Sequence, residues 1–171
     1  MKTLALLRHA KSDWSDRGLG DFDRPLAPRG IEAAPRMGRA MRARGLVPDL
    51  VLCSSATRAR ETWDLVAAEL KGTPSVQFRR GLYLASPQKL LEAVRCADSA
   101  AGTVLMIGHN PGMEFLAAAL VGPGSDPEAL KALSEKYPTA ALSVFTFDIA
   151  KWRDAGPDTG RLTQFTRPRD L

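Results

Sequence analysis

The segment TLALLRH (residues 3–9) places a short apolar run directly before an arginine and a histidine. Such a run, bounded by polar residues, is typical of a strand that is buried on both faces of a sheet. Similar runs occur at residues 49–53 and 103–108, and longer segments with helical spacing lie between them. This alternation predicts the α/β fold class, as a three-layer α/β/α sandwich with helices on both faces of a mostly parallel central sheet.

The other elements follow from apolar spacing and from glycine and proline breaks. We expect helices at residues 31–44, 58–70, 87–95, 111–120 and 129–136, and further strands at residues 75–78, 141–149 and 161–166. The fourth helix is predicted to begin with Asn110 as N-cap and Pro111 at its first position. Residues 11–29 form a polar loop whose length is typical of a functional segment. No segment rich in Pro, Gly or Ser divides the chain, so we expect one domain over residues 1–171.

The composition, with 44% hydrophobic and 25% charged residues, is that of a globular protein rather than a disordered one. The apolar runs are too short to span a membrane, and the first residues lack the pattern of a secretory signal, so we expect a cytoplasmic protein without a membrane partner. Cys53 and Cys96 lack the spacing of zinc or redox motifs, and the apolar run around Cys53 predicts its burial. With only two histidines, His9 and His109, we expect no metal ion and no other cofactor.

The chain carries 24 basic and 19 acidic residues, a formal net charge of +5, and 17 of the basic residues are arginines. Arginine suits bidentate binding of phosphate or carboxylate better than lysine does. The excess indicates either a generally basic surface or an anionic substrate or partner, and composition alone leaves both open. Aromatic residues make up only 6% and are not interleaved with basic ones, so we expect no nucleic-acid partner.

Both histidines and two arginines lie where a predicted strand meets the following helix. Arg8 and His9 end the first strand, Arg58 begins the helix after the second strand, and His109 follows the strand at residues 103–108. Ligands of parallel α/β sheets bind outside the carboxyl ends of the strands. We therefore expect these four side chains to share one pocket.

Two imidazoles and two guanidiniums in one pocket suit phosphoryl transfer, which depends on positioning and on stabilising negative charge. Arg8 and Arg58 can clamp phosphoryl oxygens, and the helix start at residues 110–111 presents a favourable dipole to an anion. One neutral imidazole can attack phosphorus and form a phosphohistidine. The other, when protonated, donates a hydrogen bond to the phosphoryl group.

Three motifs resemble those of the histidine phosphatase superfamily, which has the phosphoglycerate mutase-like fold. They are RHAKS at residues 8–12, SSATRARET at residues 54–62 and VLMIGHNPG at residues 104–112. The closer similarity is to the SixA-type branch, the phosphohistidine phosphatases, whose features here are Trp14, DFDRPL at residues 21–26 and Gly30.

By this resemblance His9 is the nucleophile that becomes phosphorylated, and Arg8, Arg58 and His109 complete the phosphate pocket. Two features depart from the superfamily pattern. Residues 10–11 are Ala-Lys where many members have Gly-Glu, and the chain has little room for an inserted segment with a catalytic glutamate.

Asp21, in the long loop, is therefore the candidate general acid, and a carboxylate that caps its loop or faces solvent is the alternative. A weak acid favours phosphohistidine as the substrate, since a leaving imidazole has a pKa of only about 6.5 and needs less help than an alkoxide. We expect a monomer and a metal-independent hydrolase that removes phosphate from protein phosphohistidine. The alternatives are a phosphatase of small phosphorylated metabolites and a non-catalytic anion- or nucleic-acid-binding module. An acidic protein partner is expected to meet Lys11, Arg17, Arg24 and Arg29.

Overall fold

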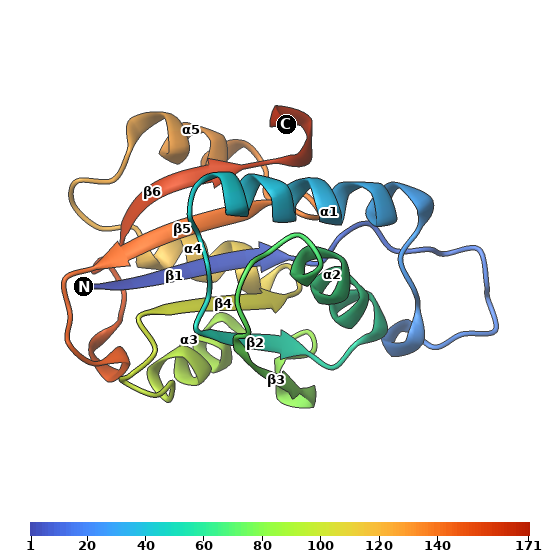
Figure 1. The fold of residues 1–171 in the computed structure, drawn as a ribbon, viewed down its shortest axis with the longest axis horizontal. Helices are drawn as coiled ribbons and strands as arrows, with labels where there is room; N and C mark the ends of the chain where they lie inside the picture. Colours follow the sequence, from blue (N-terminus) through green and yellow to red (C-terminus); the bar gives the residue numbers. More distant parts are fainter.

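A six-stranded mixed sheet forms the centre of the protein, whose computed structural model describes residues 1–171 (Figure 1). In spatial order the strands are β3 (Ser75–Arg79), β2 (Leu50–Ser54), β4 (Thr103–Gly108), β1 (Lys2–Arg8), β5 (Leu142–Phe147) and β6 (Arg161–Thr166). β3, β2, β4 and β1 pair in parallel, whereas β5 is antiparallel to β1 and β6 is antiparallel to β5. The predicted α/β class with a mostly parallel sheet is confirmed.

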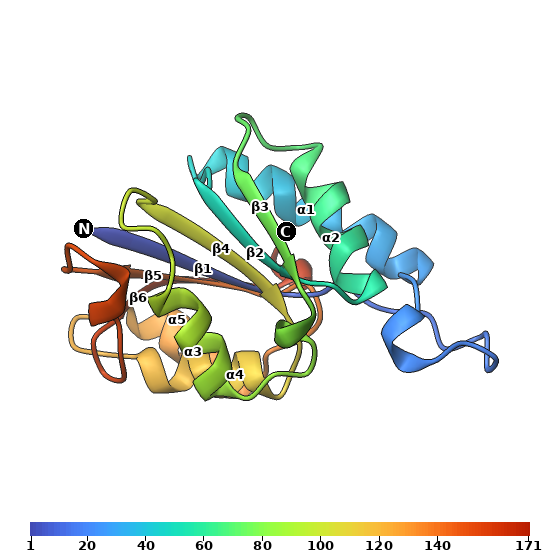
Figure 2. The ribbon, with the colours of Figure 1, turned by 90° about the horizontal axis from the view of Figure 1, so that it is seen from below.

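Five α-helices cover the two faces of this sheet, which gives the three predicted layers (Figure 2). They are, on one face, α1 (Pro28–Ala43) and α2 (Thr57–Ala67) and, on the other, α3 (Pro87–Arg95), α4 (Gly112–Leu120) and α5 (Pro127–Glu135). Short 3-10 turns occur at Asp21–Asp23, Arg80–Leu82, Trp152–Asp154 and Pro168–Asp170. None of the helices combines the length and the apolar content that a membrane span requires.

The central strand β1 shows why the sheet has two apolar cores. Leu4 and Leu6 pack into the core that includes α3, α4 and α5, while Ala5 and Leu7 pack into the core beneath α1 and α2. All four side chains are fully buried, because successive residues of a strand point to opposite faces and both faces are covered. Cys53 in β2 is buried as predicted, and burial raises the pKa of its thiol to about 12.

The ends of three helices differ from the predicted ones. α1 begins at Pro28 rather than residue 31, because a proline in the first turn needs no hydrogen-bond acceptor for an N–H group. α2 ends at Ala67. The backbone N–H groups of residues 69 and 70 donate to the carbonyl three residues earlier, as in a 3-10 turn, and not to the carbonyl four residues earlier, as in an α-helix. α5 begins at Pro127, because the side chain of Asp126 accepts a hydrogen bond from the backbone N–H of Ala129 at 2.8 Å.

The helix α4 begins one residue later than predicted, because Pro111 is its N-cap and Gly112 its first residue. The Asn110 side chain still accepts a hydrogen bond from a first-turn N–H group, that of Glu114 (3.2 Å), and it donates one to the carbonyl of Tyr137 (3.0 Å). Asn110 thus ties the start of α4 to the segment that leads into β5.

The long loop of residues 11–29 is closed at its base. Ser12 and Leu26 form a β-bridge, and the backbone N–H of Ala27 donates to the carbonyl of Lys11 at 2.8 Å. Gly30 packs directly on that same carbonyl, since a Cβ added there would lie 2.2 Å from the Lys11 oxygen. The first turn of α1 therefore lies against the chain that leaves β1, and the loop returns to the end of the strand from which it starts.

Gly30→Ala is expected to lower the free energy of unfolding by about 1–3 kcal/mol, because the new methyl group forces α1 away from a backbone oxygen. Urea unfolding followed by circular dichroism measures the change. Gly20→Ala is the control, since a Cβ at Gly20 meets nothing within 4 Å. Equal effects of the two substitutions would contradict the close approach.

Candidate active site

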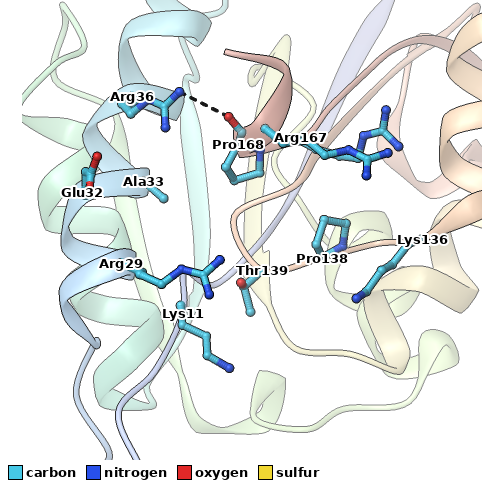
Figure 3. Close-up of a pocket in the computed structure, with 11 residues that line it drawn as sticks. Lys11, Arg29, Glu32, Ala33, Arg36, Lys136, Pro138, Thr139, Arg167 and Pro168 are labelled. Atoms are coloured by element: carbon cyan, nitrogen blue, oxygen red, sulfur yellow. Dashed lines mark hydrogen bonds between the residues drawn. The ribbon is translucent and has the colours of Figure 1, made fainter.

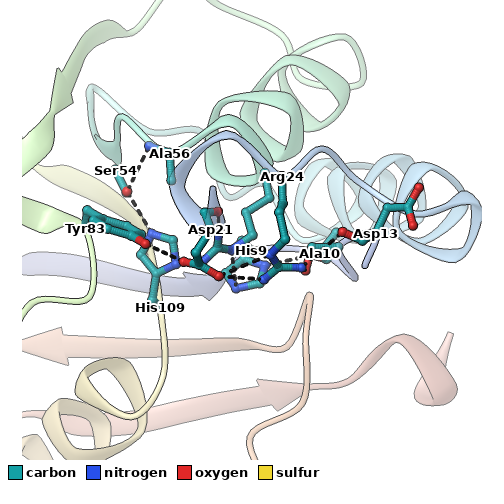
Figure 4. A network of polar contacts seen from close by, with 11 residues as sticks. His9, Ala10, Asp13, Asp21, Arg24, Ser54, Ala56, Tyr83 and His109 are labelled. Carbon is teal, nitrogen blue, oxygen red and sulfur yellow. Dashed lines mark hydrogen bonds and ion pairs between the residues drawn. The ribbon is translucent and has the colours of Figure 1, made fainter. Parts of the chain in front are cut away.

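Neighbouring parallel strands bring the two histidines together. In the pairing of β1 with β4, Arg8 lies opposite Gly108, so His9 and His109 follow at adjacent strand ends. Their ring centroids are 5.0 Å apart (Figure 4). Arg58 reaches the same place from the first turn of α2. The structure therefore places His9, His109, Arg8 and Arg58 at one edge of the sheet.

His9 presents an unprotonated ring nitrogen to the pocket. Its Nδ1 lies 2.7 Å from the carbonyl of Ala10, which can only accept a hydrogen bond, so the proton is on Nδ1. Nε2 in turn accepts a hydrogen bond from Nε of Arg58 at 3.3 Å. Burial, together with the positive charge of Arg58, lowers the pKa of His9 to about 3. The ring is therefore neutral at pH 7, with a lone pair on Nε2.

His109 presents a ring N–H group that has no partner within the protein. Its Nε2 lies 2.7 Å from Oγ of Ser54, and this oxygen already accepts from the backbone N–H of Ala56 at 3.2 Å. The proton of the buried Ser54 hydroxyl has no acceptor other than Nε2, so Ser54 donates to Nε2 and the proton of His109 is assigned to Nδ1. Nδ1 is buried and makes no hydrogen bond. A buried donor of this kind needs an acceptor, such as the oxygen of a ligand.

His109 carries no positive charge at neutral pH in this arrangement. Burial and the neighbouring Arg58 lower the pKa of His109 to about 3. The hydrogen bond to a phosphoryl group does not require that charge, since the neutral ring still donates from Nδ1.

Two guanidiniums supply the positive charge of the site. Arg58 is only 3% exposed, and it donates to the backbone carbonyl of Asp21 (2.6 Å) and to its carboxylate (3.0 Å). Arg8 donates through Nη1 to the carbonyl of Tyr137 at 3.0 Å, while its Nε is buried without a partner. Arg8 Nε and His109 Nδ1 are the two buried side-chain donors left unsatisfied, and both belong to this pocket.

Asp21 lies in the pocket as an ionised carboxylate. It accepts hydrogen bonds from the hydroxyl of Tyr83, from Arg58 at 3.0 Å and from Arg24 at 3.0 and 3.1 Å. These donors, with Tyr83 the strongest, hold the pKa of Asp21 well below its usual range. Such a carboxylate is ionised at neutral pH and is a poor proton donor. The role of general acid for Asp21 stays a prediction. Its bonds to Arg24 tie it within its own loop, as the alternative interpretation expected.

Two side chains of the site were not identified from sequence. Tyr83 follows the 3-10 turn after β3, and its ring packs edge-on against His109 with centroids 5.3 Å apart. The rule that ligands bind at the carboxyl ends of parallel strands could have found it. Arg24 was expected to face an acidic partner, and this expectation is wrong. It is 5% exposed, because it stacks on Trp14 at 3.4 Å and donates to Oγ of Ser12 at 2.7 Å.

The arrangement as a whole is suited to phosphoryl groups. A neutral nucleophilic nitrogen lies beside the guanidiniums of Arg8 and Arg58, and two donors, Nε of Arg8 and Nδ1 of His109, have no acceptor within the protein. No group of three or more His, Cys, Asp or Glu side chains is placed to hold a metal ion. The fold and this site define an α/β phosphatase with a pair of histidines at its centre.

The chain belongs to the histidine phosphatase superfamily, and the model of branch 1 of that superfamily matches residues 4–83. It is 37% identical over 164 residues to the uncharacterised protein Rv1276c of Mycobacterium tuberculosis, a match that covers 95% of this chain and all of the relative. The resemblance inferred from the three motifs is confirmed.

Two solved structures assigned to the SixA phosphohistidine phosphatases share the fold. The protein from Nakamurella multipartitia superposes with a TM-score of 0.84 at 28% identity, covering 98% of this chain and 96% of that one. The protein from Agrobacterium tumefaciens superposes with a TM-score of 0.81 at 30% identity, covering 98% of both chains.

Both imidazoles are expected to stay neutral between about pH 5 and pH 8, because their pKa values are lowered to about 3. The chain has only two histidines, so proton NMR gives two Hε1 signals to follow, and a His9→Ala variant assigns them. A midpoint near 6.5 for either ring would contradict the buried neutral pair.

Unfolding returns both pKa values toward 6.5, so the unfolded chain binds more protons than the folded one between about pH 3 and pH 6.5. The free energy of unfolding is therefore expected to fall as the pH is lowered through that window. Urea unfolding at a series of pH values measures it.

Proposed function

We propose that this protein hydrolyses phosphohistidine on proteins through a covalent intermediate at His9, without a metal ion. The observation that carries the proposal is the unprotonated Nε2 of His9, which lies 3.3 Å from Nε of Arg58 and beside a second imidazole. A neutral imidazole nitrogen is a competent nucleophile toward phosphorus. The similarity to two proteins assigned as SixA phosphohistidine phosphatases supports the choice of substrate.

In the first step Nε2 of His9 attacks phosphorus and forms a P–N bond. The P–N bond of the substrate breaks and its electron pair stays on the leaving nitrogen. Because the other nitrogen of the substrate ring carries a proton, the leaving group is neutral imidazole. Arg8, Arg58 and Nδ1–H of His109 bind the phosphoryl oxygens, whose charge they stabilise in the transition state.

In the second step water attacks phosphorus and the bond to Nε2 breaks. The electron pair returns to Nε2, inorganic phosphate forms, and the proton of the attacking water passes to phosphate or solvent. His9 is then restored to the form in which it began.

The ionised state of Asp21 favours this substrate class over alkyl phosphates. Three donors hold the Asp21 carboxylate deprotonated, so it is a poor proton source for a leaving group. An alkoxide needs a proton as it leaves, whereas a phosphohistidine ring that is protonated on its other nitrogen releases neutral imidazole, a weak base whose conjugate acid has a pKa of about 6.5.

The test compares kcat/KM for a phosphohistidine peptide, an aryl phosphate and phosphoserine, with protein dialysed against a metal chelator. The phosphohistidine peptide is expected to be the best substrate, and full activity is expected after dialysis. Higher kcat/KM on phosphoserine would instead identify a phosphatase of alkyl phosphates. Loss of activity that added metal restores would overturn the metal-free step.

His9→Ala is expected to abolish turnover, because it removes the nitrogen that forms the covalent bond. A labelled phosphodonor, an alkaline quench and peptide mapping should place the label on His9 in the unmodified protein and nowhere in the variant. Circular dichroism of the variant serves as the folding control. Full activity of His9→Ala would remove the covalent route.

Arg58→Ala is expected to lower kcat by about 10²–10³, or about 2.7–4 kcal/mol of transition-state stabilisation, as for loss of one preorganised donor. Arg60→Ala is the matched control, because Arg60 lies on the same helix but is exposed and stacks on Phe78 at 4.5 Å. A loss of less than about tenfold for Arg58→Ala would place this side chain outside the reacting centre.

A further inference from the structure

A basic cleft of about 500 Å³ lies beside the active site (Figure 3). Its walls are α1, the segment between α5 and β5, and the turn at Pro168–Asp170. Glu32 is the one acidic residue among the eleven that line it. Six lining residues are basic: Lys11, Arg29, Arg36, Lys136, Arg167 and Arg169.

Some of these cations already have partners. Arg167 pairs with Glu135 and Asp170, at 2.9 and 3.0 Å, and Arg36 donates to the carbonyl oxygen of Leu171 at 2.6 Å. These contacts connect the walls of the cleft to one another and to neighbouring loops.

Three other cations have no partner. Lys11, Arg29 and Lys136 are exposed, line the cleft and make no side-chain hydrogen bond or ion pair. They come from both walls, since Lys11 and Arg29 lie on one side and Lys136 on the other (Figure 3). Like charges gathered in a concave surface repel one another and attract an anionic ligand.

The cleft is connected to the nucleophile through both walls. Lys11 is two residues from His9, so their Cα atoms lie within about 7 Å of each other. On the other wall, the backbone N–H of Ala140 donates to the carbonyls of Arg8 and His9, at 3.0 and 3.1 Å, directly after Thr139. A single ligand can therefore reach the active site and the cleft together.

The lining determines which anion suits the cleft. It contains no aromatic side chain, whereas single-stranded nucleic acids are held by stacking on aromatic rings. Ala33 is its one hydrophobic residue, unlike the mostly apolar pockets of drug-sized ligands. Guanidinium and ammonium groups on both walls match carboxylates spread along a peptide.

We propose that this cleft docks an acidic segment of the phosphorylated protein substrate, whose Asp and Glu side chains pair with Lys11, Arg29 and Lys136. The inference rests on the proposed function and adds the feature that selects among protein substrates. It also revises the surface expected from sequence. Lys11 and Arg29 remain in it, whereas Arg24 is buried and Arg17 does not line the cleft.

The first test uses two phosphohistidine peptides of equal length, one with flanking glutamates and one with glutamines in their place. The protein is expected to show about tenfold higher kcat/KM on the acidic peptide at low salt, as the sum of a few surface ion pairs, and less at high salt. Arg29→Glu/Lys136→Glu is expected to bring the ratio of the two kcat/KM values to one or below. Equal kcat/KM on both peptides in the unmodified protein would overturn the proposal.

The matched control is Lys71→Glu/Lys151→Glu, which makes the same change in net charge at exposed lysines outside the cleft. This variant is expected to keep the preference for the acidic peptide. If it loses the preference to the same extent, net charge and not the cleft is responsible, and the proposal fails.

The second test does not depend on the reaction. Fluorescence anisotropy measures binding of a labelled glutamate-rich peptide that carries no phosphate, in competition with a single-stranded oligonucleotide of equal charge. If the unmodified protein binds the peptide and Arg29→Glu/Lys136→Glu abolishes this binding, the result supports docking in the cleft. This holds even if phosphohistidine proves not to be the substrate. Absence of binding, or tighter binding of the oligonucleotide, overturns it.

Discussion

The parallel pairing of β1 with β4 is the constraint on which the site depends. Its register sets Arg8 opposite Gly108, and the next residue of each strand is a histidine. Two segments about a hundred residues apart in the chain thereby place their rings 5.0 Å from each other. A shift of one of these strands by one residue would turn its histidine ring toward the opposite face of the sheet from the other ring. The apolar cores on both sides of β1 oppose such a shift, so the same packing that stabilises the fold positions the chemistry.

Burial then determines the protonation of the site. Both imidazoles are removed from water beside permanent guanidinium charges, so they remain neutral. Nε2 of His9 carries a lone pair toward Arg58, and Nδ1–H of His109 has no partner within the protein. Charges buried without a counterion are strongly destabilising. The carboxylate of Asp21 supplies that counterion for Arg58 through a 3.0 Å ion pair. The long loop between β1 and α1 thus contributes the carboxylate that balances the buried positive charge of Arg58 in α2.

The sequence predicts the parts of this protein that repeat a simple physical pattern. β1, β2 and β4 are recognisable because strands buried on both faces are continuously apolar, and the carboxyl-end rule then brings His9 and His109 together. The ionisation of Asp21 is not predictable in this way, since its donors come from residues 24, 58 and 83, which only the folded loop brings together. Burial of Arg24 likewise depends on the path of that loop over Trp14. The hydrogen bond from Asn110 to the carbonyl of Tyr137 spans 27 residues, and no local pattern reveals it.

The ion pair between Arg58 and Asp21 has a consequence for the end of the catalytic cycle. A phosphate group that takes the Arg58 guanidinium must compete with a carboxylate held on the same chain, at an effective concentration that a free anion rarely reaches. Free phosphate is therefore bound less tightly than by a guanidinium without a carboxylate partner. When phosphate leaves, Arg58 pairs again with Asp21 and is not left as an unpaired charge. In the proposed reaction, the internal carboxylate is expected to favour rapid product release and to limit product inhibition.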